Sequence, residues 1–109
     1  MKMLDQDAAL ARVGGDLDLL REIAVLFRQE CPPAMEILRD AIAKGDGAAA
    51  GRAAHGLKGS AANFGAGPAV DAALKIEQLA RDGRVSDTRP ALEALDQALM
   101  TLMRELQEI

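Results

Sequence analysis

Residues 46–66, DGAAAGRAAHGLKGSAANFGA, decide the fold of this chain. Asp46 stands before an alanine-rich run and can cap the N-terminus of a helix, because its carboxylate accepts a hydrogen bond from a free backbone N–H group. Gly65 follows the last apolar residue of the run, where a glycine commonly ends a helix. The stretch therefore predicts one helix, and this helix carries the only histidine of the chain, His55.

Helical geometry separates an apolar side of this stretch from the side that carries His55. At about 100° per residue, the apolar side chains that fall around Leu57 are Ala50, Ala53, Ala54, Ala61 and Phe64. A stripe of this kind packs against a core. His55 lies roughly 160° from Leu57, so we expect its imidazole in solvent, among the small residues Ala48, Gly51, Gly59 and Ala62.

Two interpretations give His55 no function. A buried core histidine is disfavoured, because burying His55 would expose Leu57 and Phe64. A solvated histidine without a role is the default for an isolated imidazole, but Gly51, Gly56 and Gly59 weaken it. Each glycine costs on the order of 1 kcal/mol against alanine in a helix interior. Their recurrence around His55 predicts close approach by another molecule. The competing explanation is that these small residues reflect a general drift of the sequence toward alanine-rich composition.

The run from His55 to Ala66, HGLKGSAANFGA, resembles the phosphoacceptor motif of histidine-containing phosphotransfer (HPt) domains, H-x-L-K-G-S-A-x-x-[LF]-G-A. The segment RVGGD at 12–16, the Cys31-Pro32 break and the Lys44-Gly45-Asp46 turn also fit this family, so the resemblance covers almost the whole chain. It implies an all-α fold, an up-down antiparallel four-helix bundle with additional short helices at one end. Residues 1–109 would form a single HPt-like domain.

The resemblance also implies roles for residues of the motif. His55 would carry the phosphoryl group, on Nε2, Lys58 would stabilise it, and Gly59 would permit docking. The spacing agrees, because Lys58 lies one turn after His55, where a cation can reach the added negative charge. Arg52, one turn before His55, either adds to this positive charge or is a solvated surface charge. We expect Ser60 to bond back to a helix carbonyl instead.

Two positions around the motif are less regular. A polar residue on the adjacent helix often hydrogen-bonds the imidazole in such domains, and Glu77 and Gln78 both fall near that place. Gln78 would be the more usual chemistry, but the sequence leaves the two alternatives open. Gly56 departs from the Ser or Thr that commonly follows the histidine, which removes a hydroxyl contact without changing the identity of the acceptor.

The rest of the chain is predicted to be helical, with short turns. Proline lacks an N–H group and restricts the residue before it, so Cys31-Pro32-Pro33 predicts a break. Cys31 would then stand at a helix end, as a structural residue. Thr88 or Asp87 is expected to cap the last helix, with Pro90 in its first turn. The expected helices cover 5–13, 17–30, 33–44, 46–66, 67–82 and 88 to the C-terminus.

Composition excludes several classes of function. The net charge of −4 and the lack of a basic stripe argue against nucleic acid and anionic membranes as partners. The single cysteine excludes an internal disulfide and a cysteine-built metal site. No signal peptide and no membrane-spanning run is apparent, so the expected location is the cytoplasm. A P-loop and a receiver-type carboxylate cluster are also missing, so we expect neither kinase activity nor a metal of its own.

The function predicted is that of a phosphorelay intermediate in two-component signalling. His55 would accept a phosphoryl group from a receiver-domain aspartate and pass it to another receiver domain. The expected partners are response-regulator receiver domains and a hybrid sensor histidine kinase, with Mg²⁺ supplied by the receiver. We expect a monomer and, from Met1 and the full set of helices, a free-standing protein. The alternative is a non-catalytic helical interaction module that binds the same domains without phosphate transfer.

Overall fold

The computed structural model describes residues 2–109 and places them in helices, turns and short connections. No strand occurs among these residues, which confirms the all-α prediction. The elements in chain order are α1 (Gln6–Arg12), α2 (Leu17–Ala43), α3 (Gly47–Ala62), α4 (Gly67–Arg81), the 3₁₀ turn η1 (Val85–Asp87) and α5 (Arg89–Leu106).

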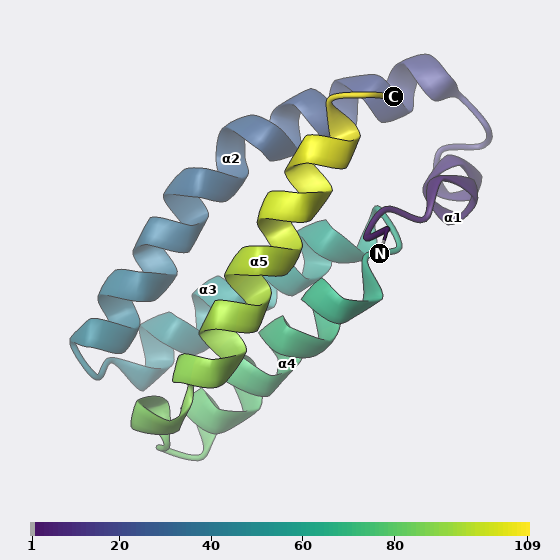
Figure 1. The fold of residues 1–109 in the computed structure, drawn as a ribbon. Coiled ribbons are helices and arrows are strands. Elements are labelled where there is room, and N and C mark those ends of the chain that lie inside the picture. Colours follow the sequence, from purple (N-terminus) through teal and green to yellow (C-terminus); the bar gives the residue numbers. More distant parts are fainter. Residues whose placement is uncertain (1) are drawn as a thin grey trace.

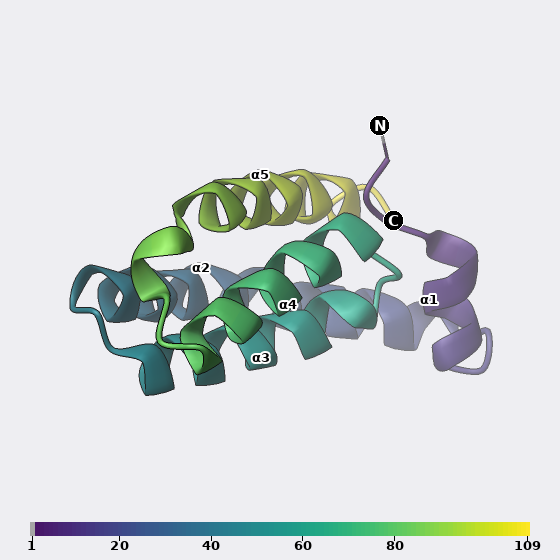
Figure 2. The ribbon, with the colours of Figure 1, turned by 90° about the horizontal axis from the view of Figure 1, so that it is seen from below.

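The four long helices pack side by side as a helical bundle (Figure 1). Helix α3 packs against α2 and α4, and α5 packs against α4 and α2. The family resemblance led us to expect additional short helices at one end of the bundle, but the short elements lie at both ends. Helix α1 lies at the end where both termini are found, whereas η1 lies at the opposite end, between α4 and α5 (Figures 1 and 2).

Helix α2 runs unbroken from Leu17 to Ala43 and contains Pro32 and Pro33 in its interior. The prediction of two helices with a break at this point was therefore wrong. Each proline removes one intrahelical hydrogen bond, but both lie on the exposed side of α2, where water can solvate the released carbonyl groups. Burial of the opposite side, including Cys31 and Met35, holds the helix together through this turn.

The helix termini follow the sequence in most cases. The carboxylate of Asp16 accepts a hydrogen bond from Leu19 N, and that of Asp46 from Ala49 N, both at 3.0 Å, so the two predicted caps are confirmed. Thr88 is the N-cap residue of α5, one of the two candidates from the sequence, but its side chain forms no capping hydrogen bond. Thr88 is buried, and its hydroxyl donates to Val85 O at 2.6 Å. Asp87 instead accepts from Arg84 Nε at 2.8 Å.

The core explains why α3 and α4 approach closely. Phe64 is fully buried and its ring meets that of Phe27 edge-on, with centroids 5.2 Å apart. Most of the buried side chains of these two helices are alanines: Ala50, Ala54 and Ala61 on α3, and Ala69, Ala72, Ala73 and Ala80 on α4. Small side chains let the two backbones come together, so polar groups at the edge of this interface are within bonding distance.

None of the helices within residues 2–109 combines the length and the apolar character that a membrane crossing requires.

Candidate functional site

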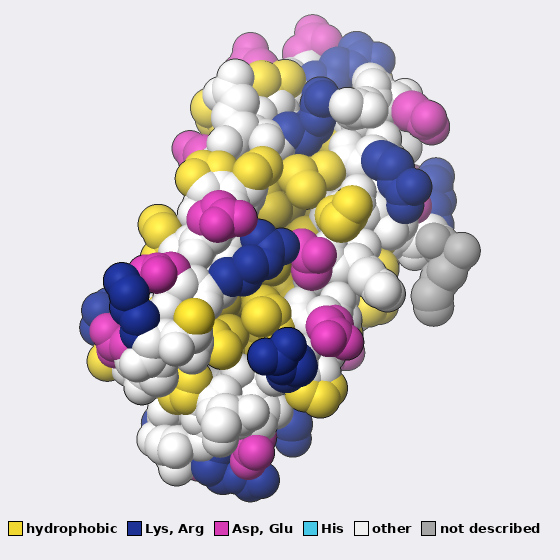
Figure 3. Space-filling view, turned by 60° about the vertical axis from the view of Figure 1, so that its left-hand side comes forward, with side chains coloured by type: hydrophobic (Ala, Val, Ile, Leu, Met, Phe, Trp, Pro, Cys, Tyr) yellow, Lys and Arg dark blue, Asp and Glu magenta, His cyan; other side chains and the backbone are white. Residues whose placement is uncertain are grey.

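His55 projects from α3 into solvent, with 66% of its side chain exposed. The opposite side of α3 is buried through Ala50, Ala54, Leu57 and Ala61, so the orientation predicted from the helical phase is confirmed. The face of the molecule in Figure 3 carries hydrophobic side chains between charged ones and shows no histidine. The imidazole therefore lies on a different face of the bundle.

The neighbour that contacts the imidazole is Glu77 of α4. Its Oε2 lies 2.8 Å from Nδ1 of His55, and its Oε1 accepts a hydrogen bond of 2.6 Å from Nζ of Lys58. Gln78, the other residue considered, is exposed, and its side chain makes no hydrogen bond within residues 2–109. Of the two alternatives, it is Glu77 that touches His55.

The charge of Glu77 determines the tautomer of His55. The hydrogen bond from Lys58 is the largest cause that lowers the pKa of Glu77 below its ordinary value, burial opposes it, and the bond to His55 adds to it. An ionised carboxylate only accepts hydrogen bonds, so Nδ1 of His55 is the protonated nitrogen. In the neutral ring the lone pair is then on Nε2, on the side away from Glu77.

Three cations surround this pair. Lys58 is 25% exposed and is engaged by Glu77 instead of standing free. Arg81, one turn after Glu77 on α4, has Nη2 3.6 Å from Oε2 of Glu77. Arg52 is exposed and forms no ion pair within the described part of the chain. Sequence reasoning missed Arg81, although its i,i+4 spacing from Glu77 is typical of a helical ion pair.

A shallow hollow of about 530 Å³ adjoins His55 on the side toward the start of α3. Its floor consists of small residues, and Arg52 and Arg81 stand at its border with Glu77. The floor residues are Gly47, Ala48, Gly51 and Ala80. The surface beside the imidazole is thus low and carries positive charge.

On the other side of His55 the surface is equally low. Gly59 is exposed and Ala62 is half-buried. A Cβ atom added at Gly59 or at Gly56 would meet no atom within 4 Å, so packing within the protein requires neither glycine. Their destabilising effect on the helix is not offset by close packing inside the bundle.

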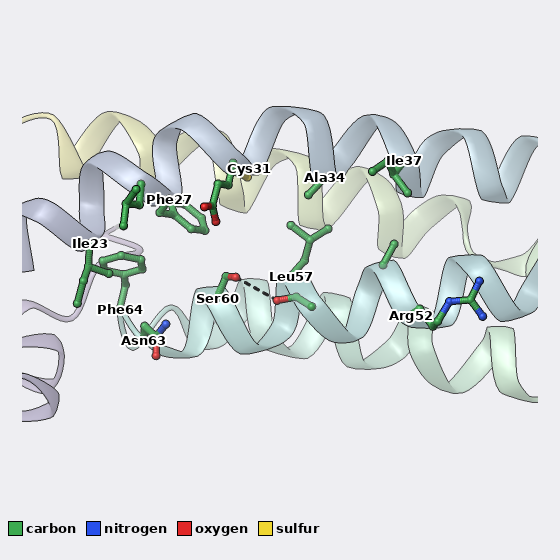
Figure 4. Close-up of a pocket in the computed structure, with 14 residues that line it drawn as sticks. Ile23, Phe27, Cys31, Ala34, Ile37, Arg52, Leu57, Ser60, Asn63 and Phe64 are labelled. Carbon is green, nitrogen blue, oxygen red and sulfur yellow. Dashed lines mark hydrogen bonds between the residues drawn. The ribbon is translucent and has the colours of Figure 1, made fainter.

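A second, deeper hollow of about 420 Å³ lies between α2 and α3 (Figure 4). Phe27, Leu57 and Phe64 contribute to its wall, and Leu26 and Ile37 of α2 border it while remaining largely exposed. The hydroxyl of Ser60 donates to Gly56 O at 3.1 Å across one turn of α3, so the predicted back-bond is confirmed. This groove is apolar and reaches the site at Arg52 and Gly56, which also line it.

Cys31 also lines this groove, but it sits inside α2 and not at a helix end as predicted. Burial is the largest cause that raises the pKa of its thiol to about 11, so it remains a protonated, apolar side chain at neutral pH. Within residues 2–109 no three histidine, cysteine, aspartate or glutamate side chains gather as a metal ion would require.

The comparison with protein families gives one result. The family model described as Hpt domain matches residues 22–107, which include the whole of α3 and α4. No curated protein and no solved structure matches the chain. The matched region covers most of the 109 residues and contains both His55 and Glu77. The chain therefore belongs to the Hpt domain family, whose members serve in histidine phosphotransfer within phosphorelay signalling.

Proposed function

We propose that His55 accepts a phosphoryl group from the aspartyl phosphate of one receiver domain and passes it to an aspartate of another. The observation that carries this proposal is the bond between Nδ1 of His55 and the ionised carboxylate of Glu77, at 2.8 Å. It leaves the lone pair on Nε2, the ring nitrogen that does not contact Glu77, in a side chain that is 66% exposed. An accessible, neutral nitrogen is what a phosphoryl acceptor needs.

The proposed step balances without any further reactant. The lone pair of Nε2 attacks the phosphorus atom, the bond between phosphorus and the aspartate oxygen breaks, and the free carboxylate remains on the donor. The phosphorylated ring keeps its proton on Nδ1 and gains positive charge, so its hydrogen bond to Glu77 becomes a charge-assisted one. The reverse sequence at the second receiver restores the neutral imidazole.

Lys58 and Arg52, two cations of the site, have different roles in this proposal. Lys58 stabilises the phosphoryl oxygens, since it lies one turn after His55 and its flexible stem lets the ammonium move. Arg52, exposed beside the hollow, raises the positive potential that attracts the phosphorylated partner. In-line phosphoryl transfer depends mainly on positioning and on neutralising charge, and both roles serve the second of these.

We assign the divalent metal of the reaction to the partner. The described residues offer no cluster of potential ligands, so Mg²⁺ would be bound by the receiver domain and brought to His55 on docking. When bound there, the ion would neutralise negative charge on the transferring group. The residues of this chain contribute the acceptor nitrogen, its tautomer and the flanking positive charge.

The proposed docking surface includes the low strip of α3 on which His55 stands. Gly59 and Ala62 leave room above the ring for a second protein. Leu26 and Ile37, with 52% and 62% of their surface exposed, border the adjoining groove and offer apolar contact. Docking of a receiver here would explain glycines that internal packing does not require.

We take residues 1–109 as one unit whose long helices α2 to α5 alternate in direction, as their short connections favour. It would act as a monomer in the cytoplasm, between a hybrid sensor kinase and a response regulator. It would supply no kinase activity of its own.

The test is phosphoryl transfer from phosphorylated receiver domains in the presence of Mg²⁺. We expect acid-labile, base-stable label on the wild-type protein and none on His55→Gln, with equal helicity and melting temperature. Label on the variant would contradict the assignment of His55. Tight receiver binding without label on the wild type would support the non-catalytic interaction module instead.

A further inference from the structure

Three cationic or hydrogen-bond-donating groups, from His55, Lys58 and Arg81, lie next to the carboxylate of Glu77. Its Oε1 is occupied by Lys58 Nζ at 2.6 Å, and its Oε2 by His55 Nδ1 at 2.8 Å. Arg81 approaches Oε2 as well, but only to 3.6 Å, and 70% of its side chain is exposed. Two contacts are thus short, whereas the third is loose and solvated.

Phosphorylation of His55, as proposed above, creates a conflict for Lys58. Its ammonium is held at Glu77, on the Nδ1 side of the ring. The phosphoryl group would be attached to Nε2, on the other side of the ring. Lys58 must therefore leave Glu77 to reach the phosphoryl oxygens, and its departure would leave Oε1 of a carboxylate that is only 12% exposed without a partner. Loss of a partner by a largely buried charge is unfavourable.

We propose that Arg81 is a positioning residue that takes the place of Lys58 on Glu77 when Lys58 moves to the phosphoryl group. The inference rests on the proposed function and adds an exchange of counter-ions to it. In the unphosphorylated protein Lys58 neutralises Glu77. In the phosphorylated protein Arg81 does so, and Glu77 continues to hold Nδ1 of His55.

The placement of Arg81 suits this role. It lies one turn after Glu77 on the same helix, so a small rotation of its side chain brings it to either carboxylate oxygen. The guanidinium has five donors and can bind both oxygens together. Ala80 and Gly51 line the same hollow as Arg81, and both are small residues. Arg52, the other cation of the hollow, is on α3 and forms no ion pair with Glu77 in the described structure.

The experiment is a double-mutant cycle on phosphorylation of the isolated protein by phosphoramidate. This small donor needs no receiver: the bond between Nε2 and phosphorus forms, the bond between phosphorus and nitrogen of the donor breaks, and ammonia leaves. The single variants are Arg81→Gln and Lys58→Met, and the double variant combines them. His55→Gln defines the background of unspecific labelling, and thermal melting verifies that each variant is folded.

We expect Arg81→Gln to lower the labelling rate constant about threefold, the scale of one solvated ion pair. In the Lys58→Met background the same substitution should have no further effect, because no ammonium remains to be released. Arg81→Lys should restore most of the rate, since it restores the charge. The matched control is Arg84→Gln, which removes an exposed arginine that pairs with Asp87 outside the site, and it should leave the rate unchanged.

Two results would overturn the inference. One is an equal loss of rate from Arg81→Gln with Lys58 present and with Lys58 replaced, which would mean that Arg81 acts directly on the phosphoryl group. The other is no loss in the wild-type background. Neither result bears on the relay itself, which fails only if receiver domains leave His55 unlabelled.

Discussion

The imidazole of His55 and the carboxylate of Glu77 meet across the interface of α3 and α4, with Nδ1 and Oε2 2.8 Å apart. His55 is largely exposed, whereas Glu77 is largely buried. The carboxylate of Glu77 thus holds the Nδ1 edge of the His55 ring, and the rest of the exposed ring stays open to a second protein. Most buried side chains of α3 and α4 are alanines, and such small side chains allow two packed helices to bring these groups together.

Removing the carboxylate should impair the acceptor. In Glu77→Ala the Nδ1–H group has no ionised acceptor, so the tautomer with its lone pair on Nε2 is less populated. We expect the labelling rate to fall about tenfold, as for loss of one hydrogen bond to a charged group. Labelling kinetics and ¹⁵N NMR of the imidazole would measure both effects. Glu93→Ala, at an exposed position of α5, is the control and should match the wild type.

Stability should depend on pH through Glu77. Its pKa is lowered in the fold from 4.5, so the ionised form is the one that the folded state favours. This contribution is fully present above about pH 4.5 and is lost as the pH falls below it, through the lowered pKa of the folded state. Urea unfolding at several pH values should show a difference between wild type and Glu77→Gln at neutral pH that diminishes in acid. A difference that is constant with pH would contradict the pairing.

The glycines around His55 allow stability and docking to be separated. Gly56→Ala and Gly59→Ala should each raise the free energy of unfolding by about 0.5–1 kcal/mol, because the new methyl group meets open space. Gly59→Ala should slow transfer from a receiver more than Gly56→Ala does, since Gly59 lies on the His55 side of α3 and Gly56 lines the adjoining groove. Thermal melting and transfer kinetics on both variants check this. Equal transfer rates for the two would remove Gly59 from the docking surface.

The prolines inside α2 should be a source of instability. Pro32→Ala supplies an N–H group for the carbonyl of Arg28 and should raise the free energy of unfolding by about 2 kcal/mol, less than the full helix penalty because the unfolded chain gains freedom. Pro90 is the matched control. It stands in the first turn of α5, where no intrahelical bond is lost, so Pro90→Ala should not stabilise the protein. Denaturant unfolding of both variants measures the contrast.

Local sequence signals were sufficient for much of the fold. Asp16 and Asp46 predicted two helix starts, because a capping carboxylate acts on the backbone of its own first turn. The apolar stripe around Leu57 predicted the buried side of α3 and hence the exposure of His55. In each case one helix contained all the information that the prediction needed.

The predictions that failed or stayed open concern features that depend on the packing of two elements against each other. Burial along α2 outweighs the helix-breaking tendency of Pro32 and Pro33, and the strength of that burial depends on neighbouring helices. Thr88 is buried, so its hydroxyl bonds to a nearby carbonyl instead of capping α5. The choice between Glu77 and Gln78 depends on the rotation of α4 against α3, which no single helix pattern reveals.

The most direct test of the central claim is ³¹P and ¹⁵N NMR of the protein labelled with ¹⁵N-histidine and phosphorylated by a receiver domain. Because the chain contains a single histidine, any coupling between phosphorus and a ring nitrogen reports on His55. We predict one phosphorus signal, coupled to Nε2, with Nδ1 still protonated toward Glu77. Coupling to Nδ1, or a phosphorus signal coupled to neither ring nitrogen, would contradict the claim that Glu77 directs the phosphoryl group to Nε2 of His55.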